Sequence, residues 1–336
     1  MTERAPMQLV CPWHRDTLQQ LWQQHQDGRL PHALLLCGHA GIGKVRLARA
    51  FAESVMCQQP RAGMACGLCQ GCRLAAAGSH PDMAMLAPEE GSKAIKIDQV
   101  RELVEFCART PQFGGYRVVV VFPAEAMNRN AQNALLKTLE EPGSNTLLLL
   151  VSHQPGRLLP TVRSRCQQRL LPLPAHADGL AWLNEQIGQG ERAEALLALA
   201  GGAPLQALAL EGSDWFASRD KLVNQMLALV AGRQPVSQVA QAFASQDTVG
   251  LLDALYSWSH AALGWLSRGR EPADRQLAGS LVKLADAVGA QRLLAFNQQL
   301  ARSRRALLSG SNPNRDLLFE QLLLVLVGVD ADRYAF

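Results

Sequence analysis

The chain has 336 residues, of which 48% are hydrophobic, 5% aromatic and 18% charged, and its net charge is +4. Two or three globular domains are expected at this length, and the small positive charge, with no long run of lysine or arginine, does not by itself indicate nucleic-acid binding. No stretch approaches the ~18 consecutive apolar residues of a membrane span, and the N-terminus lacks the apolar core of a signal peptide, so we expect a cytoplasmic protein without membrane contact.

The first half of the chain predicts an α/β domain with a mostly parallel sheet, because short apolar runs alternate with helical segments. The strands are expected at Ala33–Cys37, Met83–Leu86, Arg117–Phe122 and Thr146–Val151, and the helices at 14–27, Val45–Met56, Asp98–Arg109 and Asn130–Glu141. We expect Asp98 to be the N-cap of its helix and Pro142 to end the last one. The last two strands are apolar without alternation, as expected for strands buried on both faces.

The second half predicts helices alone, after a proline-containing connector at Leu170–Pro174. Leucine and alanine recur there at helical spacing, with a glycine-rich break at Gly201–Pro204. The helices are expected within Ala177–Ala200, shortly after Pro204, and at 215–231, 236–245, 248–267, 273–309 with a break, and 314–328. We therefore expect three domains: an α/β domain over 1–168, a small helical domain over 169–210 and an all-α domain over 211–336.

A glycine loop follows the first strand and leads into a helix. It contains Gly38, Gly43 and Lys44 in the spacing of a phosphate-binding P-loop, in which backbone N–H groups approach phosphate and the lysine neutralises it. A glycine-rich turn of another kind is the plain alternative. The next position of a P-loop is normally Ser or Thr, which binds magnesium, but here it is Val45. The sequence leaves open whether ATP is still bound.

The strand that should deliver acid to the metal also departs from the pattern. An ATPase of this type ends that strand with Asp, to hold magnesium, and often with Glu, to orient water. Here Phe122 and Pro123 stand at those positions, and Glu125 lies three residues past the strand. Since two independent magnesium contacts are missing, we expect the site not to hydrolyse ATP.

Four cysteines cluster between the first and second strands, at Cys57, Cys66, Cys69 and Cys72. In a reducing compartment such a cluster indicates metal binding rather than disulfides, and four thiolates close a tetrahedral zinc site. Four unliganded thiols and an iron–sulfur cluster are the alternatives. With no open coordination position, the expected zinc is structural.

Arg165 lies within a Ser-Arg-Cys triplet shortly after the fourth strand. One interpretation is a cation at a helix end. The other is an arginine finger, a guanidinium that one subunit places against the γ-phosphate bound by its neighbour. The local sequence does not choose between them.

Together these features resemble the AAA+ (RecA-like) subunits of bacterial clamp loaders in DNA polymerase III holoenzyme. The motifs that carry the resemblance are Asn133–Pro142, Ser164–Cys166, the four-cysteine insertion and Gly78–Asp82, and they span the first ~210 residues. The resemblance implies that Arg165 is an arginine finger acting in trans, that the four cysteines bind zinc, and that Lys44 is the P-loop lysine. The lid of the hydrolysing relatives also carries a sensor arginine, and Leu205 stands at that position here.

These departures make the chain similar to the clamp-loader member that does not hydrolyse ATP. The resemblance implies an ATPase-like domain, a helical lid and a helical collar in a hetero-pentamer with gamma/tau and delta subunits, which loads the sliding clamp onto primed DNA. DNA polymerase activity would then belong to the complex, since no polymerase or nuclease carboxylate set is evident. The alternatives are an active gamma/tau-like ATPase and a zinc-dependent DNA-binding module.

Overall fold

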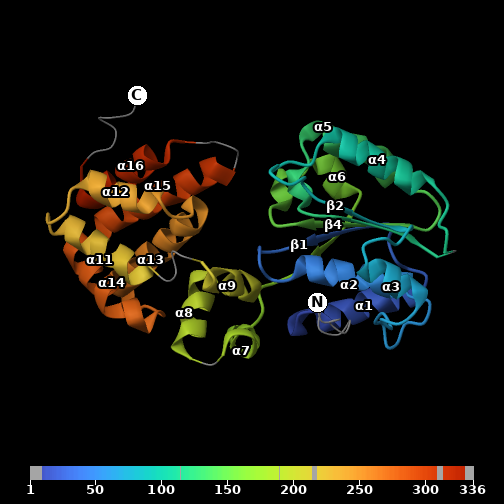
Figure 1. Ribbon diagram of the computed structural model, residues 1–336, viewed down its shortest axis with the longest axis horizontal. Coiled ribbons are helices and arrows are strands. Elements are labelled where there is room, and N and C mark those ends of the chain that lie inside the picture. Colours follow the sequence, from blue (N-terminus) through green and yellow to red (C-terminus); the bar gives the residue numbers. More distant parts are fainter. Residues whose placement is uncertain (1–9, 114, 189, 214–217, 309–312, 330–336) are drawn as a thin grey trace. The chain divides into compact units, whose positions relative to one another are not determined.

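The computed structural model describes residues 10–113, 115–188, 190–213, 218–308 and 313–329. The chain forms two compact units, Met1–Asp178 and Gly179–Phe336, and each is described by itself. The first is built of strands and helices and the second of helices (Figure 1).

The first unit contains a parallel sheet with the strand order β2-β3-β4-β1-β5. Its strands are β1 Ala33–Cys37, β2 Met83–Leu86, β3 Arg117–Val121, β4 Thr146–Ser152 and β5 Gln167–Leu170. Every residue of β1, β3 and β4 is buried, which confirms the prediction of central strands covered on both faces. Because all strands run in the same direction, the residues that follow β1, β3 and β4 meet at one edge of the sheet.

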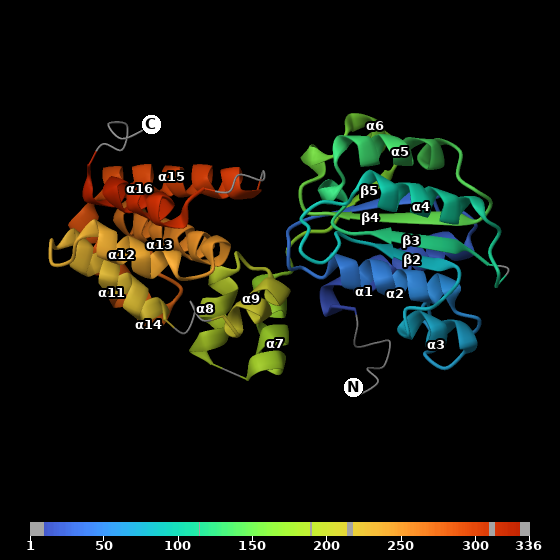
Figure 2. The ribbon, with the colours of Figure 1, turned by 45° about the horizontal axis from the view of Figure 1, so that its top comes forward.

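Helices cover both faces of this sheet (Figures 1 and 2). The elements beside it are η2 Pro12–His14, α1 Arg15–Gln26, α2 Lys44–Met56, α3 Gln70–Ala76, α4 Ile97–Ala108, η3 Ala124–Ala126, α5 Arg129–Glu140, η4 Pro155–Arg157 and α6 Pro160–Ser164. Helices α1 and α2 pack on one face, while α4, α5 and α6 share an apolar core with the other. The predicted α/β class of this unit is confirmed.

The differences from the sequence-based prediction include a helix start, a strand end and an additional strand. Helix α4 begins at Ile97 with Lys96 as its N-cap rather than Asp98, because the Gln99 side chain accepts a hydrogen bond from the Lys96 N–H at 2.9 Å and caps the helix earlier. Strand β3 ends at Val121, one residue early. Strand β5 was not predicted, because its sequence, Gln-Gln-Arg-Leu, is largely polar and exposed, as an edge strand permits.

The second unit is entirely helical among its described residues, as predicted. Its helices are α7 His176–Ile187, which begins at the end of the first unit, α8 Glu191–Leu199, α9 Pro204–Glu211, α11 Arg219–Val230, α12 Val236–Ala244, α13 Thr248–Arg268, α14 Arg275–Val288, α15 Ala290–Leu308 and α16 Arg315–Val327. The predicted helix start at Trp215 lies outside the described residues, and the predicted break falls at Gly289. The division into domains at 169–210 and 211–336 stays a prediction.

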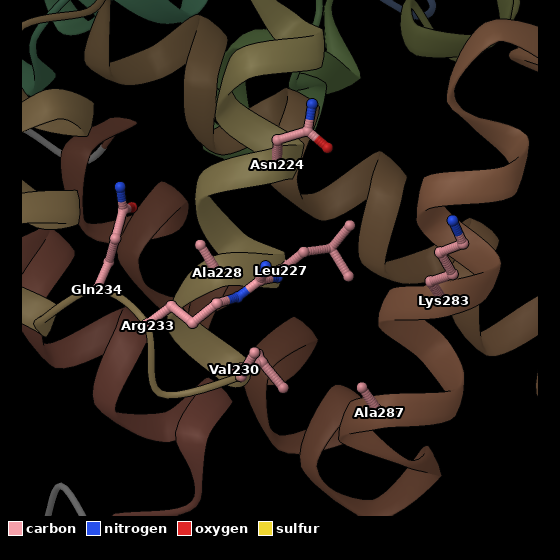
Figure 3. A pocket seen from close by; sticks show the side chains of 9 residues that line it. Asn224, Leu227, Ala228, Val230, Arg233, Gln234, Lys283 and Ala287 are labelled. Atoms are coloured by element: carbon pink, nitrogen blue, oxygen red, sulfur yellow. The ribbon is translucent and has the colours of Figure 1, made fainter.

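The helical unit has an open pocket among the described residues, and the length of its helices can be compared with that of a membrane span. Helices α11 and α14 border an open pocket of about 780 Å³ whose rim includes Arg233 and Lys283 (Figure 3). The residues that line it belong to none of the motifs found in the sequence. Among the described helices, no single one is long and apolar enough to cross a bilayer, although the bent pair α8–α9 passes by length and composition.

Candidate functional site

The glycine loop joins the end of β1 to the start of α2. Gly38 has φ +151°, and a Cβ there would lie 2.3 Å from the carbonyl oxygen of Leu171, so only glycine fits. Gly43, the N-cap of α2, has a left-handed backbone with φ 91°. The predicted strand–loop–helix context of a P-loop is therefore present at Gly38, Gly43 and Lys44.

The Lys44 side chain is directed back into its own loop. Its Nζ donates to the carbonyl oxygen of Gly38 at 2.7 Å and also to that of His39, and the residue is 2% exposed. Burial lowers the pKa of Lys44 to about 8, and the nearby Glu125 carboxylate partly offsets that shift. The ammonium group thus hydrogen-bonds two loop carbonyls in this structure.

Residues before α1 close the loop from the other side. Trp13 Nε1 donates to the carbonyl oxygen of Ile42 at 2.9 Å, and His14 Nε2 lies 2.8 Å from the same oxygen. Since that oxygen can only accept, His14 carries its proton on Nε2. Burial lowers the pKa of His14, which favours this neutral ring. The sequence offered no signal for this contact, because the partners are nearly 30 residues apart.

At the end of β3, Glu125 is tied to the end of β4. Its Oε1 accepts hydrogen bonds from the backbone N–H groups of His153 at 2.9 Å and Gln154 at 3.2 Å. The rings of Phe122 and His153 meet edge to face with centroids 5.4 Å apart. Glu125 also interacts electrostatically with Lys44. The carboxylate therefore links two strand ends and the loop lysine.

The positions that present magnesium ligands in an ATPase lack oxygen here. Val45, Phe122 and Pro123 have no side-chain oxygen, and one of the two carboxylate oxygens of Glu125 already accepts hydrogen bonds from the backbone N–H groups that follow β4. The lid position Leu205 lies in the first turn of α9 and is likewise apolar. The arrangement combines the shape of a nucleotide site with few of its chemical groups.

The four clustered cysteines form a compact sulfur site beside α3. All four Sγ atoms lie within 4.8 Å of one another, and the pairs Cys57–Cys69 and Cys66–Cys72 are each 3.9 Å apart. A tetrahedral zinc ion with Zn–S bonds of ~2.3 Å requires sulfurs about 3.8 Å apart, so the cluster fits this ion. All eight cysteines of the chain are free, which is consistent with a metal-type cluster rather than disulfides.

Backbone N–H groups donate hydrogen bonds to these sulfur atoms. Cys57 Sγ accepts from the N–H groups of Gln59 at 3.4 Å and Cys66 at 3.2 Å, and Cys69 Sγ accepts from that of Cys72 at 3.4 Å. Hydrogen bonds from the backbone N–H groups of Leu68 and Cys69 lower the pKa of Cys66 to about 6, whereas burial raises the pKa of Cys57 and of Cys72. Such donors stabilise the deprotonated sulfur that a metal requires.

The Gly78–Asp82 motif joins α3 to β2, and its last residue contacts the loop that precedes β3. Asp82 is fully buried and accepts from the backbone N–H groups of Gln112 at 2.8 Å and Phe113 at 2.9 Å. It also forms an ion pair of 3.1 Å with the buried Arg117. The motif thus fixes the start of two neighbouring strands.

Arg165 lies on the surface, directly after α6. Its Nη1 donates to the carbonyl oxygen of Thr161 at 3.0 Å, and its Nη2 lies 2.5 Å from Oε1 of Glu140. The Arg165 side chain is 35% exposed, so its guanidinium is accessible to a second molecule. Glu140, at the end of α5, was not singled out in the sequence, because its pairing depends on how α5 and α6 pack.

The structure therefore places the predicted residues at three separate positions: the loop after β1, the sulfur cluster beside α3 and the end of α6. The fold and the first of these sites define an AAA+-like α/β protein with a P-loop-like glycine loop, in which Val45, Phe122 and Pro123 carry no side-chain oxygen.

Comparison with known proteins gives the family. The family model described as "DNA polymerase III, delta subunit" matches residues 13–174, and that described as "DNA polymerase III, delta subunit, C terminal" matches residues 213–327. The chain is 43% identical over 321 residues to the DNA polymerase III subunit delta' of Pseudomonas aeruginosa, covering 94% of this chain and 96% of that protein. It is 34% identical over 326 residues to the delta' subunit of Escherichia coli, covering 93% and 94%.

A shorter similarity connects the chain to a tau/gamma subunit. The DNA polymerase III subunit tau/gamma of Haemophilus influenzae is 34% identical over 143 residues, which cover 43% of this chain and 20% of that protein. The similarity to delta' proteins extends over nearly the whole length and that to tau/gamma does not. The chain belongs to the family of DNA polymerase III delta' subunits.

Proposed function

We propose that this chain is the subunit of a clamp loader that does not hydrolyse ATP and that supports hydrolysis by its neighbours. In this proposal it assembles with tau/gamma and delta subunits into a hetero-pentamer in the cytoplasm. The complex opens the sliding clamp and places it on primed DNA, and any polymerase activity belongs to the holoenzyme. The observation that carries the proposal is the nucleotide site, in which Lys44 hydrogen-bonds its own loop while Val45, Phe122 and Pro123 offer magnesium no oxygen.

Arg165 is the residue through which the subunit acts on ATP. A guanidinium has five N–H donors, and two are engaged by Thr161 and Glu140, so three remain for the phosphate oxygens of a nucleotide held by the next subunit. A cation at that position stabilises the negative charge that develops during phosphoryl transfer. Its exposure suits a role across a subunit interface.

The sulfur cluster is proposed to hold one structural zinc ion through Cys57, Cys66, Cys69 and Cys72. The S–S distances and the surrounding N–H donors support a closed tetrahedral site. Zinc bound by four thiolates keeps no position for water or substrate, so it stabilises the fold rather than performing chemistry. Cys57 directly follows α2, and Cys72 lies in α3. A shared metal ion would therefore connect the end of α2 to the start of α3.

The expected result of a reconstitution experiment follows from this role. Purified tau/gamma and delta subunits should form a complete loader with this chain and should hydrolyse ATP in a DNA- and clamp-dependent manner. Without this chain, we expect the remaining subunits to lose DNA-dependent turnover and clamp loading. Gel filtration and a phosphate-release assay measure the two effects. Failure of the chain to co-elute with the other subunits would contradict the proposal.

A further inference from the structure

The strongest unassigned feature is the ion pair that holds Arg165. We propose that Glu140 is the positioning residue of the arginine finger: it fixes the guanidinium at the subunit surface before the neighbour's ATP arrives. This inference rests on the proposed role of Arg165 and adds a second residue to it. The Nη2–Oε1 distance of 2.5 Å is that of a short, charge-assisted hydrogen bond.

The two residues are carried by elements that are firmly anchored in the core. Leu139, next to Glu140, is 1% exposed, and Val162, three residues before Arg165, is fully buried. Gln132 on α5 accepts a hydrogen bond from the Leu159 N–H at 2.7 Å and donates to the carbonyl oxygen of Met127 at 2.9 Å. These contacts connect α5 to the residue just before α6, so the relative positions of Glu140 and Arg165 are set by the fold.

Glu140 occupies a position that is unfavourable for a carboxylate on its own. It is the last residue of α5, where the helix dipole disfavours negative charge, and Glu141 adds a second negative charge beside it. Arg165 compensates this cost, and in return loses part of its rotamer freedom. A free arginine side chain has many rotamers, and a finger that is already ordered does not lose this freedom when it meets the phosphate.

The geometry of the pair also leaves the finger usable. Thr161 and Glu140 each take one N–H, from Nη1 and Nη2 respectively, and leave Nε–H and one N–H on each terminal nitrogen. Arg165 can therefore contact phosphate without first breaking the ion pair. Glu140 consequently acts as a support that remains in place during catalysis.

The test uses adjacent glutamates as a matched pair in the reconstituted loader. Glu140→Ala and Glu141→Ala remove the same charge from the same helix end, but only the first removes the partner of Arg165. We expect Glu140→Ala to lower kcat at the one ATP site that Arg165 completes, followed as the rate of its ADP burst, about two- to fivefold, the size set by a half-exposed ion pair, with KM for ATP and subunit assembly unchanged. Glu141→Ala should leave kcat at the wild-type value.

A double-mutant cycle separates this role from a purely structural one. In a loader that carries Arg165→Ala, adding Glu140→Ala should have no further effect on kcat, because the finger it positions is gone. The inference would be overturned if Glu140→Ala lowered kcat by the same factor with and without Arg165. Equal effects of Glu140→Ala and Glu141→Ala on kcat would also overturn it. Unchanged or faster turnover with Glu140→Ala, together with slow turnover for Arg165→Ala, would also overturn the inference. That result would leave the proposed function of Arg165 intact. Normal turnover with Arg165→Ala would overturn both.

Discussion

Replacing Arg165 with alanine is expected to stop rapid ATP hydrolysis at the one site that this subunit completes. An arginine finger is worth about 10³–10⁵-fold in rate, because it stabilises charge that appears only in the transition state. The other sites of the loader keep their own catalytic groups. A rapid-quench experiment on the assembled loader measures the ADP formed in the first turnover. The amplitude of this burst should decrease by the contribution of one active site, and clamp loading should become slower.

The same variant should leave assembly and folding unaffected. Arg165 is partly exposed and packs into no apolar core, so its truncation creates no cavity. Arg165→Lys retains the charge but loses the planar fork, and we expect it to remain slow. Arg109→Ala, a change at an exposed arginine at the end of α4, is the control and should behave like the wild type. A full ADP burst with Arg165→Ala would refute the finger.

Loss of the metal is the second change with a large expected effect. Structural zinc binds comparable thiolate sites with about 10–16 kcal/mol, and part of that free energy appears as folding stability. We expect the purified protein to contain one zinc ion per chain. Cys69→Ser, or a strong chelator, should lower the free energy of unfolding by at least ~3 kcal/mol. Elemental analysis and thermal unfolding measure the two quantities.

A cysteine outside the cluster provides the matched control. Cys107 lies on α4 and packs in the apolar core of the first unit, where burial raises its pKa to about 11. Cys107→Ser should retain zinc and remain sensitive to the chelator, whereas Cys69→Ser should lack both properties. Chelation should not change any affinity for duplex DNA. A protein that is purified without metal, and whose melting temperature does not change when chelator is added, would contradict a structural zinc. Bound iron would indicate the iron–sulfur alternative.

The central sheet could be predicted from the sequence because its strands are continuous apolar runs. Arg117–Val121 and Thr146–Ser152 are buried along their whole length, and no helix period competes with them. Strand β5 could not be predicted in the same way, since three of its four residues are polar and its pairing with β1 depends on the finished sheet. The same reason applies to the short helix α6, which is fixed by packing against α5.

Some functional residues could be predicted from local sequence patterns, and others could be identified only from the fold. Lys44, Arg165 and the four cysteines stand in local patterns, so the sequence alone identified them as candidates. Trp13 and His14 carry no local pattern, and Glu140 lies in the Asn133–Pro142 motif without a signal for its ion pair, because each contacts a residue that is far away in the sequence. Glu125 was noted for its position after the strand, but its hydrogen bonds to the backbone after β4 required the fold. What the sequence could not show is which side chains hydrogen-bond the carbonyl groups of the glycine loop.

The central claim, that this AAA+ fold serves other subunits and not its own ATP, is tested most directly by the isolated protein. Phosphate release from Mg·ATP should stay at background for the wild type and for Lys44→Met alike. The variant should instead melt at a lower temperature, because two loop carbonyls lose their donor at a cost of ~1–3 kcal/mol each. Steady turnover by the wild-type chain that Lys44→Met abolishes would contradict the account.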